Sequence, residues 1–87
     1  MTIKSGFMLR DIAGQWVVVP LGARVVDFNS ILTLSESAAI LWRSLEKGAE
    51  KSQLVERLLN EYHVSEDKAT QDVRKFLDTL QEKGLMD

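Results

Sequence analysis

The sequence predicts an α+β fold, in which an N-terminal antiparallel sheet of three or four strands precedes a three-helix bundle. The chain has 87 residues and is 45% hydrophobic, which is typical of one globular domain, here taken as residues 1–87. Residues 1–34 carry only five charged side chains and are rich in β-branched and aromatic residues, whereas residues 35–87 carry 19 charged side chains. Near residue 33 the apolar pattern changes from short strand-like runs to helical spacing, and strands followed by helices favour the α+β class.

The first two predicted strands form a β-hairpin. Residues 7–12 and 15–19 are apolar runs separated by the dipeptide Ala13-Gly14, and a two-residue connection containing glycine is typical of a tight hairpin turn. Pro20 follows the second run and ends it, because proline cannot donate to a strand ladder.

The rest of the sheet is expected to end at Leu34, so that the strands occupy about residues 7–34. Residues 25–28 and 31–34 are both strand-like, and Asn29-Ser30 between them fits either a tight turn or a bulge in one longer strand. Short strands leave an edge unpaired, so we expect the last strand to offer backbone donors and acceptors to a partner.

Three helices are predicted over about residues 35–47, 51–62 and 66–83. The tetrapeptide Thr33-Leu34-Ser35-Glu36 fits a capping box before the first helix, and Ser65 is a good N-cap for the third. Each segment carries an apolar stripe at helical spacing. The stripe residues are Ala38, Leu41, Trp42 and Leu45, then Leu54, Val55, Leu58, Leu59 and Tyr62, then Ala69, Val73, Phe76, Leu77 and Leu80. Trp16 and Trp42 are expected in the core.

Composition excludes several functional classes. The chain has no cysteine and one histidine, so disulfides, thiolate metal sites and zinc clusters are not expected. No Gly-rich phosphate loop or G-x-S-x-G motif is present, so we expect no catalytic residues and no cofactor. No apolar run approaches the ~20 residues of a membrane span, which predicts a cytoplasmic protein without a membrane partner.

A DNA-binding winged helix is the main alternative, because three helices and a hairpin can place the third helix in a DNA groove. Charge argues against it: the whole chain has a net charge of −2, and residues 66–83 carry four cations against five anions. A peptidyl carrier protein is disfavoured, since the serine of Asn29-Ser30-Ile31 lies between strand-like runs.

Three stretches of the sequence form a combined pattern: residues 34–42 (LSESAAILW), residues 54–64, and residues 72–85 with D-V-x-x-F-L-x-x-L. Together they resemble the PqqD-like family, also called the RiPP recognition element, where RiPP denotes a ribosomally made and modified peptide. The resemblance covers residues 6–86 and implies a winged-helix-like fold of three strands and three helices. It implies a peptide-binding module rather than an enzyme. The family includes both free-standing and enzyme-fused domains, and at 87 residues this chain is expected to be free-standing.

The resemblance also implies how a leader peptide binds: it adds as a strand beside the third strand, in a groove closed by the third helix. Lys75 and Lys83 are expected to pair with acidic leader side chains, and Asp72 to accept from a backbone or basic group. The expected peptide-binding residues are Asp27, Phe28, Ile31, Leu32 and Thr33 from the strand, and Asp72, Lys75, Phe76, Thr79, Leu80 and Lys83 from the helix.

The expected partners follow from the same resemblance. The chain presents the leader of a precursor peptide to a separate modifying enzyme, such as a radical SAM enzyme, a protease or a cyclase. Its oligomeric state is either a monomer or a homodimer formed through the edge strand, and such a dimer would compete with the leader.

Overall fold

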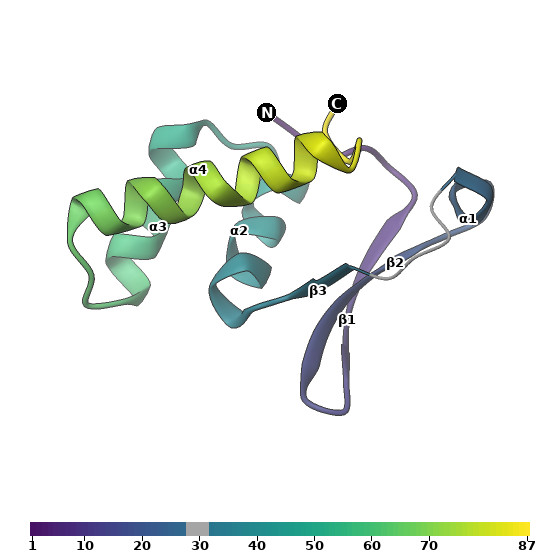
Figure 1. Cartoon of the computed structure of the whole chain (residues 1–87), viewed down its shortest axis with the longest axis horizontal. Helices are drawn as coiled ribbons and strands as arrows, with labels where there is room; N and C mark the ends of the chain where they lie inside the picture. Colours follow the sequence, from purple (N-terminus) through teal and green to yellow (C-terminus); the bar gives the residue numbers. More distant parts are fainter. Residues whose placement is uncertain (28–31) are drawn as a thin grey trace.

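The computed structural model describes residues 1–27 and 32–87, and it confirms the predicted fold class. A three-stranded antiparallel sheet in the order β1-β2-β3 leads into three helices, and a short helix, α1, lies between β2 and β3 (Figure 1). The elements are β1 (Phe7–Ile12), β2 (Gln15–Pro20), α1 (Arg24–Asp27), β3 (Leu32–Leu34), α2 (Glu36–Glu46), α3 (Lys51–Glu61) and α4 (Glu66–Glu82).

The predicted hairpin closes at Ala13 and Gly14, whose φ angles are both positive, at 54° and 82°. Two successive positive φ angles are characteristic of a type I′ turn, whose twist matches that of the flanking strands. The carboxylate of Asp11 accepts a hydrogen bond from the backbone N–H of Gly14 at 3.1 Å and thereby supports the turn.

The two faces of the sheet differ in burial. Val18 and Leu34, which are 2% and 8% exposed, lie on the face that packs on the helices. Met8 and Ile12 lie on the opposite face and are 39% and 50% exposed. Trp16, expected in the core, is only partly buried on the inner face, and the guanidinium of Arg43 stacks 4.6 Å from its ring centroid.

The strand predicted over residues 25–28 was wrong, because residues 24–27 form helix α1. Arg24 explains the difference: its Nε donates to the Ser5 carbonyl at 3.0 Å, and its guanidinium lies 5.7 Å from the centroid of the Phe7 ring. These contacts hold the segment against the start of β1. The described part of the sheet therefore has three strands, and its third strand is three residues long.

The helices begin and end within one residue of the predicted boundaries. Ser35 and Ser65 are the N-caps of α2 and α4, and their hydroxyls accept from backbone N–H groups at 3.2 and 3.1 Å. The capping box predicted at Thr33–Glu36 was misplaced, because Thr33 belongs to β3. A side-chain-to-N-cap bond of that type is found at α3, where the Glu50 N–H donates to Oε1 of Gln53 at 2.8 Å.

The core lies between the sheet and the helices, and Trp42 is its largest fully buried side chain, as expected. The ring of Phe7 meets Trp42 edge to face, with centroids 6.5 Å apart. The chain ends lie side by side (Figure 1), because Ile3 pairs with Met86 in an antiparallel bridge. Among the described residues, no helix is both long and apolar enough to cross a lipid bilayer.

Candidate functional site

Strand β3 lies at an edge of the sheet, as expected, and the pairing register shows which of its backbone groups are free. Ile12 and Gln15 close the two-residue hairpin and therefore exchange backbone hydrogen bonds, and such pairs alternate along an antiparallel ladder. The bond of 2.8 Å from the Leu21 N–H to the Gly6 carbonyl fits this alternation. It follows that Trp16 and Val18 direct their backbone groups away from β1, toward β3.

The same alternation continues across the next strand pair. Trp16 lies opposite Leu34 and Val18 opposite Leu32, so these pairs carry the hydrogen bonds between β2 and β3. Thr33 is the residue of β3 between them, and its N–H and C=O must point to the open side. Its side chain is exposed. The described edge therefore offers a peptide one donor and one acceptor, both from Thr33.

A pocket of about 280 Å³ opens where β3 ends and α2 begins, against the side of α4. Leu41, Leu58 and Phe76 give it an apolar base, since they are 2%, 2% and 8% exposed. Its volume lies near the lower end of the ~300–1,000 Å³ typical of small-molecule sites, so it suits a single side chain. The lining residues are Ser35, Ser37, Ala38, Leu41, Leu58, Asp72, Lys75, Phe76 and Thr79.

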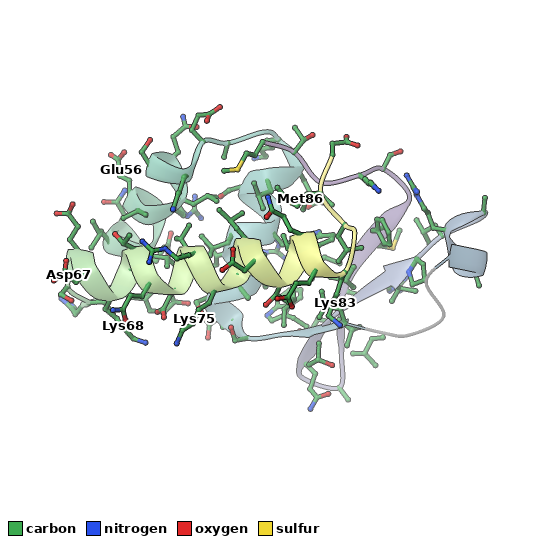
Figure 2. The ribbon with its side chains drawn as sticks, turned by 45° about the horizontal axis from the view of Figure 1, so that its top comes forward. Glu56, Asp67, Lys68, Lys75, Lys83 and Met86 are labelled. Atoms are coloured by element: carbon green, nitrogen blue, oxygen red, sulfur yellow. The ribbon has the colours of Figure 1, made fainter. Side chains whose placement is uncertain are left out.

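One row of residues on α4 forms the wall of this site. Spacings of three and four place its members on one face of the helix. In Figure 2, Lys68, Lys75 and Lys83 extend from the same edge of α4, the edge along which β3 runs. We call these residues the α4 row: Lys68, Asp72, Lys75, Thr79 and Lys83.

Interactions within the α4 row determine which groups remain available. Lys68 Nζ contacts the Asp72 carboxylate at 3.0 Å, so Asp72 already has a partner on its own helix. The hydroxyl of Thr79 donates to the Lys75 carbonyl at 2.9 Å. Lys75 and Lys83 are exposed, and neither forms an ion pair with another side chain that the structure describes.

The structure brings only part of the expected site together. Asp72, Lys75, Phe76 and Thr79 line the pocket, and Lys83 caps the end of α4. Leu80 does not lie at the surface: it is 0% exposed and supports the wall from the core.

The structure places only some of the residues expected in the groove strand within β3. Leu32 and Thr33 lie in β3, and Leu32 packs partly buried on the core. The placement of Asp27 in the groove strand was wrong, because Asp27 belongs to α1. Phe28 and Ile31 lie outside the described residues.

Sequence reasoning missed the pocket residues of α2 and α3. Ser35, Ser37 and Ala38 lie where β3 ends and α2 begins. Their position directly after the predicted edge strand is the sequence signal that could have identified them. Leu58 had no such signal, because its apolar spacing on α3 is that of any core residue.

Tyr62, which follows α3, has a perturbed pKa. Burial raises the pKa of its hydroxyl above 10.0, and the carboxylates of Glu36 and Glu61 raise it further. The hydroxyl therefore stays neutral at physiological pH, and it has no hydrogen-bond partner in the described structure.

The chemistry of the site is that of binding an extended chain. It combines an open strand edge, an apolar pocket and cations. Within the described ranges, no three His, Cys, Asp or Glu side chains lie close enough to hold a metal ion.

Known proteins share the sequence pattern and the fold of this chain. The sequence matches the family model of coenzyme PQQ synthesis protein D (PqqD) over residues 15–86, and no curated protein matches it. The solved structure of TbiB1 in complex with the TbiA(beta) leader peptide is similar, with 24% identity and a TM-score of 0.78 over 100% of this chain and 95% of that chain. A lasso peptide synthetase B1 complexed with its leader peptide has 19% identity and a TM-score of 0.75, over 95% of this chain and 92% of that one. These two likenesses show a shared fold.

Proposed function

Since the chain belongs to the PqqD family, whose model matches residues 15–86, we propose that it binds the leader segment of a ribosomally synthesised precursor peptide. The observation that carries this proposal is the position of the apolar pocket directly beside the open edge of β3. The two similar structures, each a complex with a leader peptide, support it.

The leader adds to the sheet as a strand next to β3. Its backbone pairs with the N–H and C=O of Thr33, and its side chains then alternate between the two faces of the sheet. Those on the inner face point toward α4, where one apolar side chain enters the pocket beside Ala38 and Phe76.

The magnitudes show that backbone pairing contributes only part of the affinity. Two hydrogen bonds to Thr33 supply roughly 1–3 kcal/mol net, whereas a micromolar dissociation constant corresponds to about 8 kcal/mol. Burying one large apolar side chain adds roughly 1.5–3 kcal/mol. Side chains that reach the pocket and the α4 row therefore determine which leaders bind well.

The bound leader is presented to a separate modifying enzyme, such as a radical SAM enzyme, a protease or a cyclase. The binding-competent form is the monomer, because a dimer joined through β3 would occupy the edge that the leader needs. The encounter takes place in the cytoplasm, where precursor peptides are made.

The test is an amide chemical-shift titration of the ¹⁵N-labelled chain with a synthetic leader from a precursor encoded nearby. We expect the largest shifts at residues 32–38 and 72–83, with a micromolar or lower dissociation constant. The matched control is Glu56→Ala, an exposed change on α3 that should leave binding unchanged. Shifts with duplex DNA at low salt, and none with any leader, would instead favour a winged-helix regulator.

A further inference from the structure

The groove side of α4 differs in charge from the helix as a whole. Residues 66–82 carry three cations and five anions. Within the α4 row, the pairing of Lys68 with Asp72 cancels one charge of each sign and leaves Lys75 and Lys83. The groove therefore faces a bound peptide with two positive charges, although α4 is acidic overall.

Three arginines near the sheet and helices have local partners. Arg24 binds the Ser5 carbonyl, Arg43 stacks on Trp16, and Arg57 contacts Glu61 at 3.2 Å. Lys75 and Lys83 lack such contacts in the described structure, although both side chains are exposed beside the groove. They are available to a ligand without first breaking an internal ion pair.

The separation of the two lysines corresponds to a defined spacing along an extended peptide. Eight helical residues advance about 12 Å at ~1.5 Å per residue. A strand advances ~3.4 Å per residue and shows every second side chain on one face, so same-face positions recur at about 6.8 and 13.6 Å. In Figure 2, the strand that leads into α2 passes beside the C-terminal half of α4, where Lys75 and Lys83 are labelled, so a strand added to β3 follows this part of the row.

We propose that the groove selects leader segments carrying two acidic side chains four residues apart, one for Lys75 and one for Lys83, with an apolar side chain for the pocket near the first. This inference rests on the proposed leader-binding function and specifies its substrate class. Lys75 lines the pocket, so the first acidic residue lies close to the pocket residue, and the second lies toward the end of α4.

The experiment measures the affinity of the leader used in the titration for Lys75→Glu and Lys83→Glu. Each reversal replaces an attraction with a repulsion and should weaken binding about tenfold, an effect that shrinks near 1 M salt, where the screening length is ~3 Å. The matched control is Arg74→Glu, the same charge change at an exposed position one residue from Lys75 and on another face of α4. It should change affinity less than about twofold.

Charge-swapped peptides assign each lysine to its position. A lysine in place of the first acidic residue should restore binding to Lys75→Glu only, and a lysine in place of the second should restore binding to Lys83→Glu only. Moving the two acids to a spacing of two or six should lose the contribution of one of them. Equal losses for Arg74→Glu, rescue without positional preference, or a tightly bound leader lacking such a pair would overturn the inference.

The pocket separates this inference from the proposed function. If Ala38→Leu, which fills the pocket, strongly weakens binding while both charge reversals leave it unchanged, the chain binds leaders but does not select them by acidic spacing. If the leader binds none of the variants and not the unaltered chain, the proposed function itself fails.

Discussion

The sheet has two edges, and the longer one is not the one at which we propose peptide binding. Strand β1 has six residues and β3 has three, so β1 offers the longer edge. Yet β1 packs chiefly on β2, whereas β3 leads into α2 beside a pocket formed with α3 and α4. The difference shows that an edge gives generic hydrogen bonding, while recognition needs an adjacent surface for side chains.

The side chains of β1 also make it a poor edge for pairing with a peptide strand. Arg10 and Asp11 place charges along it, and charged residues are a common way to protect an edge strand from unwanted pairing. The guanidinium of Arg10 donates to the sulfur of Met8 at 3.5 Å and lies over the outer face. Comparing the two edges by mutation therefore tests whether the pocket or the edge decides binding.

The largest expected effect comes from filling the pocket. Ala38→Leu places a larger apolar side chain in the pocket that we propose for a leader side chain. We expect this change to remove roughly 2 kcal/mol of apolar burial and to weaken binding about 30-fold. Calorimetric titration measures the affinity, and thermal unfolding checks that the variant is folded. An unchanged affinity in a folded variant would place the recognition surface elsewhere.

A second, smaller effect compares the edges directly. Thr33→Pro removes the one backbone donor that β3 directs outward and leaves its bonds to β2 intact, which weakens leader binding about tenfold. Asp11→Pro is the matched change on β1, because the same alternation directs the backbone of Asp11 outward. It should lower stability slightly and leave the affinity of the folded chain unchanged. Equal losses in the two variants would contradict the assignment of the edge.

The smallest effect concerns the buried hydroxyl near the start of α2. Tyr62→Phe removes an unpaired buried hydroxyl, so the free energy of unfolding should be unchanged or about 1 kcal/mol higher, and leader affinity should not change. In the unaltered chain, the raised pKa of Tyr62 favours folding below pH 10, and this advantage is lost as the pH rises further. The difference in free energy of unfolding between Tyr62→Phe and the unaltered chain should therefore depend on pH only in the alkaline range. Weaker leader binding would show that the hydroxyl contacts the peptide.

Local chemistry explains what the sequence could predict. The turn at Ala13-Gly14 and the N-caps at Ser35 and Ser65 depend only on neighbouring residues, so they could be predicted from short stretches of the sequence. Helix α1 was not, because its β-branched residues favour a strand and a contact between Arg24 and the start of β1 overrides them.

The candidate site was predictable only in part for a related reason. The α4 row follows from helical periodicity, and even the bond between Lys68 and Asp72 lies at a spacing that sequence can show. The pocket requires Ala38, Leu58 and Phe76, which come from three helices, and only their packing brings them together. The burial of Leu80 depends on the exact rotation of α4 against the core.

The paired chain ends have a consequence for folding and local opening. Thr2 and Asp87, which hydrogen-bond to each other, are 85 residues apart in the sequence, and closing so long a loop in a free chain costs on the order of 4 kcal/mol. We therefore expect the bridge between the chain ends to form after the sheet and helices have brought them near, and to open early when the native protein fluctuates. Ile3, Lys4 and Ser5 line a small cavity with Trp42, so each opening briefly uncovers the centre of the core.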